Sequence, residues 1–178
     1  MVETKWMGRM WALSGGLLLA AGCTDEGTGV GAGFGSQLNC TIAESEIFNG
    51  GPGKDGIPAL TNPKMVPAGD PDAAYLRDDD RVIGLLFGDE VLAVPLNILW
   101  WHEIVNLNLP GHQVAVTHCP LTGSSMAFDR SAVDGAELGV SGLLYRNNLI
   151  MYDRNTQESL WPQMLRGARC GVATGQVL

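Results

Sequence analysis

Positive charge, histidine and cysteine are scarce in this chain of 178 residues. Only 17% of the residues are charged, and 11 Lys and Arg stand against 19 Asp and Glu, which gives a formal net charge of −8. An acidic surface repels the phosphates of nucleic acid, so this balance argues against a nucleic-acid-binding protein. Low charge together with 46% hydrophobic residues argues against disorder throughout, and the length favours one domain with a real core.

Long apolar runs are also missing, because none able to span a bilayer occurs after residue 25. Residues 10–21 are apolar but too short for a mature membrane helix, as in the core of a signal peptide. They lead into Leu19-Ala20-Ala21-Gly22-Cys23, which resembles the bacterial lipobox. We therefore predict a lipoprotein-type signal peptide over 1–22 and a lipid anchor on Cys23, which would hold the protein at a membrane of the bacterial cell envelope, facing the periplasm or the exterior. An ordinary secretory signal with an incidental Cys is the alternative.

Glycine is abundant, with 24 Gly and 9 Pro, so turns should be many and long helices absent. Residues 23–39 alternate Gly with small residues and predict a flexible tether. Residues 40–178 then form a single domain. Within it, apolar runs at 81–87 and 91–95 flank a Gly-containing loop and predict a hairpin, while apolar spacing over 97–105 predicts a helix. Further short strands are predicted at 114–116, 125–128, 138–141 and 149–152. The expected fold class is mostly β (α+β), with short antiparallel strands, hairpins and one or two short helices.

The number of cysteines limits which of them can form a disulfide. Lipidation of Cys23 would leave three, and in an oxidising envelope an odd number gives one disulfide and one free thiol. Cys40 and Cys170 lie outside the region that is richest in polar motifs. We therefore predict that these two are paired and that Cys119 is free. A disulfide that includes Cys119 is the alternative, and it would exclude a metal thiolate.

All three histidines fall in one short window, directly before Cys119. Imidazole and thiolate ligands suit zinc or copper, and thioether ligands would favour copper. The predicted metal ligands are His102 and Cys119, with His118, Met126 and Met151 as weaker candidates. The spacing matches no zinc ribbon or finger, so the ordinary alternative is that the histidines only form hydrogen bonds within turns. His112, in a Pro-Gly turn, is the least suitable ligand.

Catalytic templates fit poorly. The zincin pattern HExxH begins at His102, but Asn106 stands where the second His is required. No G-x-S-x-G nucleophile motif occurs. Cys119 remains a candidate catalytic nucleophile with His102 as its partner, because a reactive thiolate needs a neighbouring cation to lower its pKa.

Six ordered groups of residues stand out between residues 55 and 163. They read DGIPAL (55–60), PLNIL (95–99), WHEIVN (101–106), THCPLTG (117–123), GVSGLLY (139–145), and MYDR (151–154) followed by LWPQ (160–163). Together they resemble one bacterial family, the domain-of-unknown-function 3179 family, over roughly residues 46–178. The resemblance implies an envelope protein and names no substrate. It also implies a truncated copy or a fragment, since family members run further beyond Gly171.

Carried across by position, the resemblance marks a set of motif residues: His102, Glu103, Asn106, Cys119, Thr122, Gly123, Ser141, Asp153, Arg154 and Trp161. His118 departs from the family, which usually has an aromatic residue there.

Several of these motif residues are polar but have strongly apolar neighbours in the sequence, where an unpaired charge would cost several kcal/mol. We therefore expect them to be paired or bound to a ligand. For Asp153 the ordinary expectation is a buried ion pair with an Arg, and the functional one is a polar pocket in which Cys119 and His102 face a metal or a small ligand. Three functions follow: a copper- or zinc-binding envelope lipoprotein first, a non-catalytic binding or scaffold domain second, and a thiol-dependent enzyme third.

Overall fold

The computed structural model describes residues 39–157 and 159–178, so the predicted signal peptide, Cys23 and almost all of the tether lie outside it. The strands are β1 (Ile47–Asn49), β2 (Leu60–Thr61), β3 (Val82–Phe87), β4 (Glu90–Pro95), β5 (Ile104–Leu109), β6 (His112–Cys119), β7 (Ser124–Asp129), β8 (Leu138–Tyr145), β9 (Asn148–Asp153) and β10 (Leu160–Pro162). The helices are α1 (Leu96–His102) and four short 3-10 helices, η1 (Glu44–Glu46), η2 (Pro71–Ala73), η3 (Arg130–Val133) and η4 (Gln163–Leu165). The predicted fold class, mostly β with short antiparallel strands, is confirmed.

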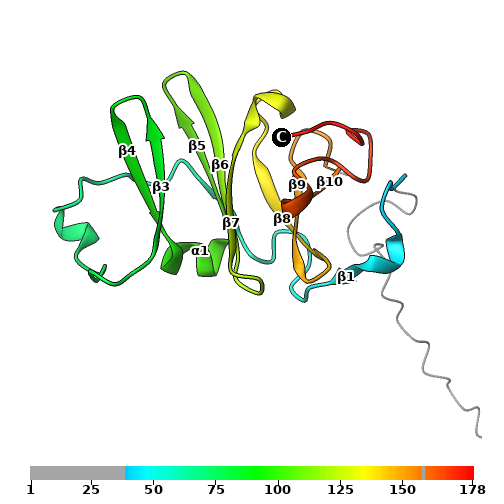
Figure 1. The fold of residues 1–178 in the computed structure, drawn as a ribbon, viewed down its shortest axis with the longest axis horizontal. Helices are drawn as coiled ribbons and strands as arrows, with labels where there is room; N and C mark the ends of the chain where they lie inside the picture. Colours follow the sequence, from blue (N-terminus) through cyan, green and yellow to red (C-terminus); the bar gives the residue numbers. More distant parts are fainter. Residues whose placement is uncertain (1–38, 158) are drawn as a thin grey trace, which may run out of the picture.

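Three sheets follow one another along the long axis of the molecule (Figure 1). The β3–β4 hairpin lies at one end. The second sheet has the order β2-β5-β6-β7, in which β2 runs parallel to β5 and the other pairs are antiparallel. The first sheet has the order β1-β8-β9-β10 and is antiparallel throughout. Helix α1 packs against β4, β5 and β6, so it joins the hairpin to the second sheet.

Turn residues explain why adjacent strands pair. Arg146 and Asn147 both have positive φ angles, 49° and 65°, and form the two-residue connection between β8 and β9. Two consecutive left-handed residues match the twist of a two-residue hairpin. Gly88 (φ 60°) serves the β3–β4 connection in the same way, because glycine adopts this conformation without strain. The predicted hairpin of residues 81–87 and 91–95 is thereby confirmed.

Three apolar clusters form the core. The first cluster lies between the β2-β5-β6-β7 sheet and the β1-β8-β9-β10 sheet, and it contains Ala115, Cys119, Met151 and Trp161. The third lies between the second sheet and the hairpin with α1, and it receives Val114 and Val116 from the opposite face of β6. The second cluster packs Ile47 of β1 against β8 to β10 beside Cys170. Because successive side chains of a strand point to opposite faces, β6 serves two of these clusters at once.

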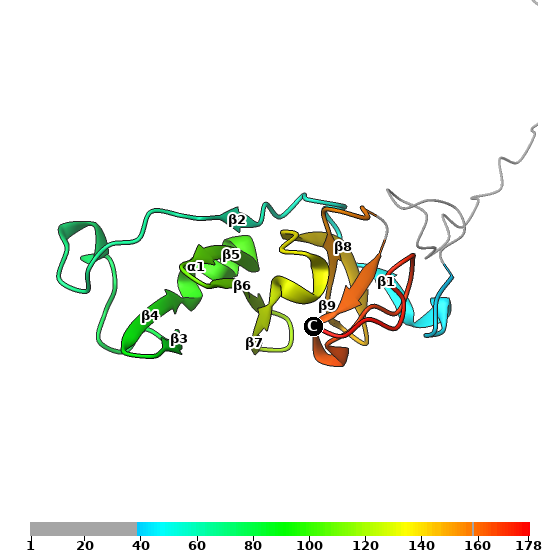
Figure 2. The same ribbon diagram turned by 90° about the horizontal axis from the view of Figure 1, so that it is seen from above.

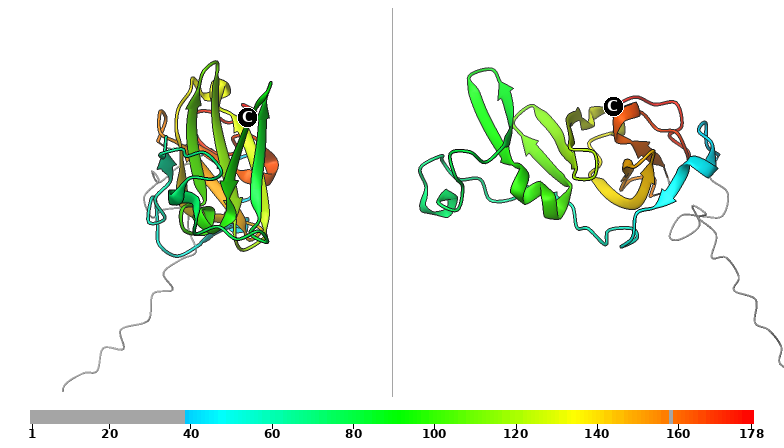
Figure 3. Two further views of the ribbon diagram at one scale, coloured as in Figure 1. Left: turned by 90° about the vertical axis from the view of Figure 1, so that its left-hand side faces the viewer. Right: turned by 60° about the horizontal axis from the view of Figure 1, so that its bottom comes forward.

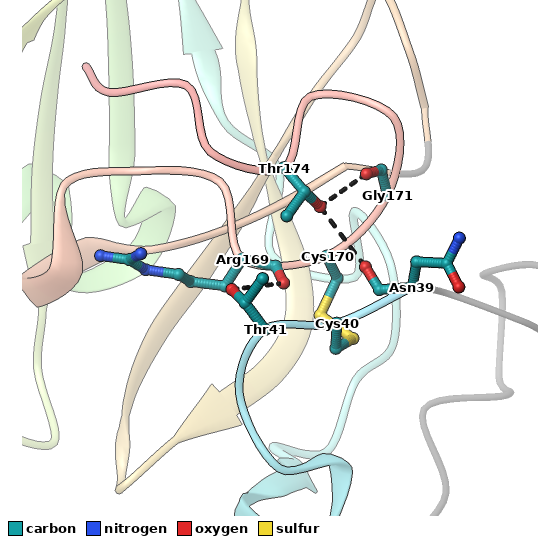
Figure 4. Close-up of a disulfide and its surroundings, with 7 residues drawn as sticks. All are labelled: Asn39, Cys40, Thr41, Arg169, Cys170, Gly171 and Thr174. Atoms are coloured by element: carbon teal, nitrogen blue, oxygen red, sulfur yellow. Dashed lines mark hydrogen bonds between the residues drawn. A yellow bond between two sulfur atoms is a disulfide. The ribbon is translucent and has the colours of Figure 1, made fainter.

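A disulfide joins Cys40 to Cys170 across 130 residues. Beside it, the Thr41 hydroxyl donates a hydrogen bond to the carbonyl of Arg169 (3.2 Å; Figure 4). The backbone N–H of Thr41 donates to the same carbonyl (2.6 Å). Cys119 is buried and free. The predicted pairing is therefore confirmed, and the alternative with Cys119 in the disulfide is wrong.

The predicted helix over 97–105 is shorter than expected. It ends at His102, where Glu103 adopts φ 57° and ψ −32°, and β5 begins at the next residue. Val105 consequently lies in a strand, and Trp101, expected on the apolar helix face, is 73% exposed. None of the helices within 39–157 and 159–178 has the length and apolarity needed to cross a membrane.

Candidate functional site

The three sulfur-containing candidates lie in the same apolar cluster. Cys119 is 1% exposed, Met151 is fully buried, and Met126 packs against the cluster from β7. The Cys119 Sγ lies 3.9 Å from the carbonyl oxygen of Asn147, at the β8–β9 turn. These three side chains lie near one another, and their surroundings are those of core residues.

The histidines lie elsewhere. The side chain of His118 lies on the opposite face of β6 from that of Cys119. Its Nδ1 lies 2.9 Å from the Ser125 hydroxyl. His102 ends α1, and its Nδ1 lies 2.8 Å from the carbonyl oxygen of Pro58. His112 is exposed, with its ring centroid 4.9 Å from that of Phe87. In the part of the chain that the structure describes, no group of three or more His, Cys, Asp or Glu side chains could hold a metal. The copper or zinc site stays a prediction.

Glu103 is a motif residue whose titration is altered by burial. Its backbone N–H bonds to Leu99 O, and its own carbonyl accepts the N–H of His118 (2.8 Å). The carboxyl group is partly buried, and burial raises its pKa from 4.5 to about 7. Burial also lowers the pKa of His118, so that this imidazole is neutral near pH 7.

Two of the polar motif residues hold the fold together. The Asn106 amide donates to Leu138 O (3.0 Å) and accepts from Leu138 N (2.9 Å), which fastens β5 to β8 of the neighbouring sheet. The Ser141 hydroxyl donates to Ile150 O (2.6 Å) and accepts from Leu143 N (3.0 Å), where the β8–β9 register shifts. Both side chains are buried with their hydrogen bonds satisfied, so they are paired as expected and leave no group to bind a ligand.

The expected ion pair of Asp153 with an Arg is wrong. The buried Asp153 carboxylate accepts hydrogen bonds from Trp161 Nε1 (2.9 Å), Thr156 N (2.7 Å) and the Thr156 hydroxyl (2.8 Å). Arg154 points to the surface and pairs with Asp55 at 3.2 Å. The reason is alternation along β9, which turns consecutive side chains to opposite faces. Neutral donors from the following turn are therefore the groups that reach Asp153.

Thr122 belongs to a polar cluster that sequence reasoning missed. The Asn148 amide nitrogen donates to Thr122 Oγ1 (2.9 Å), Ser124 Oγ (2.8 Å) and Gln163 Oε1 (3.0 Å). Gln163 is fully buried and donates to Thr117 Oγ1 (2.8 Å). The available signal was the Gln that ends the LWPQ motif. The cluster ties the turn after β6 to the start of β9 and to η4.

A cleft of about 360 Å³ opens beside α1. We call it the tryptophan cleft, and its lining residues are Asp79, Asp80, Arg81, Leu96, Asn97, Trp100, Trp101 and His118. Of the residues proposed from the sequence, only His118 reaches it. The sequence signal that was overlooked is the pair of adjacent tryptophans in a short helix.

The tryptophan cleft combines aromatic faces with hydrogen-bonding groups. Trp100 is 57% exposed and Trp101 is 73% exposed, whereas Trp161 is fully buried. Two carboxylates and one guanidinium come from the segment before β3, and the amide of Asn97 comes from α1. Such a surface can stack on a flat apolar face and at the same time bind hydroxyl groups.

The family model for proteins of unknown function DUF3179 matches residues 54–178. The chain belongs to the DUF3179 family. No curated protein and no solved structure matches it. The family resemblance given by the six motifs is thereby confirmed, but membership of DUF3179 names no activity. Function has to be argued from the site.

Most DUF3179 motif residues in this chain have structural partners. Asn106, Ser141 and Asp153 are buried and hydrogen-bonded to neighbouring backbone or turn residues. Asp55 of the first motif bonds to Tyr152 and Arg154 of the last, so two motifs far apart in sequence meet at the surface. Trp101 differs, because it is a motif residue that exposes a large apolar side chain to solvent.

Proposed function

We propose that this DUF3179 protein is a non-catalytic binding protein of the bacterial cell envelope, and that its tryptophan cleft takes a neutral oligosaccharide. The observation that carries the proposal is the exposure of Trp100 and Trp101 beside Asp79, Asp80 and Asn97. Large exposed apolar side chains that border a hollow are typical of binding sites.

The chemistry of the cleft matches that of a sugar ring. One face of a pyranose presents C–H groups, which stack on an indole, and its rim carries hydroxyl groups. Carboxylate and amide oxygens accept hydrogen bonds from those hydroxyls, while the guanidinium of Arg81 donates to their oxygens. The two carboxylates outnumber the single cation, so an uncharged ligand fits better than an anionic one.

The surroundings of Cys119 favour binding over thiol catalysis. Its thiol is enclosed in the first core cluster, and its one hydrogen-bond contact is the carbonyl of Asn147. His102, the proposed catalytic partner, instead contacts Pro58. A thiol in such apolar surroundings packs as a small hydrophobic side chain.

We also propose that the protein is lipid-anchored at Cys23 in the cell envelope. The Cys40–Cys170 disulfide supports this location, because structural disulfides persist in oxidising compartments. Radiolabelled palmitate incorporated into the parent chain, but not into Cys23→Ser, would support the anchor. Equal labelling of both would contradict it.

Calorimetric titration tests the oligosaccharide proposal. The full chain carrying Cys23→Ser, kept in detergent-free buffer, is titrated with soluble oligomers of glucose and of N-acetylglucosamine. We expect saturable binding of at least one of them. Trp101→Ala should weaken this binding about tenfold, since an aromatic stacking contact contributes about 1 kcal/mol beyond its buried area.

Leu86→Ala provides the matched control, because Leu86 is 72% exposed but lies on β3 outside the tryptophan cleft. Its affinity should equal that of the parent, and thermal unfolding should show that both variants are folded. Absence of binding to every oligomer, or an equal loss in the two variants, would overturn the proposal.

A further inference from the structure

A second, larger cavity of about 640 Å³ borders α1 through residues that the tryptophan cleft does not use. We call it the apolar cavity. Its floor is formed by β4, by Ile98 of α1, and by Val105 and Leu107 of β5. Its cover comes from residues 63–76. The volume lies within the roughly 300–1,000 Å³ range of small-molecule pockets.

The lining of the apolar cavity is mainly hydrocarbon. Val94, Val105 and Leu107 belong to the third core cluster and are buried, so the floor of the cavity is part of the core. Its charged lining residues are Lys64 and Asp72, which pair with each other and are both well exposed. A ligand inside therefore meets no unpaired charge, and any polar group on it has to stay at the mouth.

The segment that covers the cavity, residues 63–80, is fastened to the body at its two ends. Before it, Asn62 N donates to Asn106 O (2.8 Å) and Asn62 Oδ1 accepts from Asn108 N (2.7 Å). After it, Leu96 N donates to Arg81 O (3.0 Å). Within the described chain, the hydrogen bonds and ion pairs found for residues 63–80 stay inside the segment. Figures 2 and 3 show this cover segment looping out beyond the β3–β4 hairpin at one end of the molecule.

The cover segment contributes to none of the three core clusters, although its residues Met65, Val66, Tyr75 and Leu76 line the cavity. Its charged residues are Lys64, Asp70, Asp72, Arg77, Asp78, Asp79 and Asp80. Met65 and Tyr75 are exposed by 46% and 53%, although both line the cavity. Protein interiors are close-packed, and a space of this size between a core floor and the apolar side chains of the cover that line it lacks the contacts that would normally fill it. The missing partner is therefore hydrocarbon.

We propose that the apolar cavity binds one acyl chain of an envelope lipid, with the cover segment closing over it and the polar head at Lys64 and Asp72. The shape supports a chain, because β4 lines the cavity along five consecutive residues, Val91–Pro95, which span about 13 Å. The lining is mainly aliphatic, and Tyr75 is its one aromatic residue. This proposal uses a different site from the oligosaccharide proposal and does not rest on it.

Fluorescence titration with cis-parinaric acid, a fatty acid that becomes fluorescent in apolar sites, tests the proposal on the full chain carrying Cys23→Ser without detergent. We expect saturation near one probe per chain. Ala93→Trp, at an exposed position of β4 that lines the cavity, should weaken binding on the order of tenfold, because the displaced methylene groups stay in water. Ala127→Trp, at an exposed position of β7 outside the cavity, should bind as the parent does.

A second variant, Met65→Asp, places a charge on the exposed cover segment without touching the core, and it should weaken binding as well. Trp101→Ala should bind the probe normally, which separates this site from the tryptophan cleft. Circular dichroism confirms that each variant is folded. No saturable binding by the parent, or parent-like binding by both Ala93→Trp and Met65→Asp, would overturn the proposal. So would a dimer in solution that buries this face and excludes the probe.

Discussion

Glu103 stands at the point where α1 ends and β5 begins, in a left-handed conformation and with a pKa raised to about 7 by burial. Between about pH 4.5 and pH 7 the folded state holds this proton more tightly than the unfolded state. The free energy of unfolding therefore falls as the pH rises through that window, and the loss is complete above it. Burial thus makes one carboxyl a source of pH-dependent stability.

Glu103→Gln should remove this dependence. We expect the variant to be more stable than the parent at pH 8, by on the order of 2 kcal/mol, and about equally stable at pH 4.5. Urea unfolding of both proteins at several pH values measures the difference. Two parallel stability curves would show that Glu103 does not titrate in this range.

Copper or zinc binding at His102 and Cys119 is a prediction of the sequence with a direct test. If this hypothesis holds, elemental mass spectrometry of the reconstituted full chain finds about one equivalent of metal, and both His102→Ala and Cys119→Ser lose it. His112→Ala, at an exposed histidine outside the predicted ligand set, is the control. Absence of metal in a folded parent chain would end the metal hypothesis.

Among the secondary-structure elements, the ones whose position depends on nearby residues in the sequence were predicted correctly. Gly-containing turns and apolar runs located the β3–β4 hairpin and the cores of β6 to β9. The end of α1 was not predicted, because apolar residues at 98, 101 and 105 fit a longer helix, whereas β5 gains its hydrogen bonds from β6 and β2. Trp101 belongs to the helix that ends at His102 and is exposed rather than buried, so the tryptophan cleft could not be found by spacing alone.

Side-chain partners were the least predictable, since they depend on strand register. His118 and Cys119 are adjacent in sequence yet serve opposite faces of β6. Asp153 and Arg154 separate in the same way. Residues that are close in sequence and chemically suited to a site can therefore form one only if the alternation of side chains along the strand places them on the same face.

The hydrogen bonds of Asn106 connect strands β5 and β8 of two neighbouring sheets. Its amide satisfies both backbone groups of Leu138, and removing it leaves a buried N–H and a buried C=O unpaired. Asn106→Ala should lower the free energy of unfolding by about 2–4 kcal/mol. Chemical unfolding measures this loss, and Asn155→Ala, at an exposed turn residue, should change stability by much less. A neutral Asn106→Ala would mean that the two sheets do not depend on this bridge.

At the scale of the whole molecule, a disulfide links distant parts of the described chain. The disulfide closes a loop of 130 residues, which restricts the unfolded chain more than a short loop would. Reduction, or the double variant Cys40→Ser with Cys170→Ser, should destabilise the protein by about 4–5 kcal/mol in the chain-entropy model. Unfolding curves with and without reductant measure the effect. An unchanged midpoint would show that the bridge does not limit the unfolded chain.

The same bridge makes almost the whole domain a covalent ring. Backbone cleavage at any single bond between residues 41 and 169 leaves two pieces that remain one molecule through Cys40 and Cys170. The exposed cover segment is the natural place for such a nick, because exposed loops are preferred sites of proteolysis. A protein clipped there would keep its three sheets in one covalent molecule, and its fragments would part only on reduction.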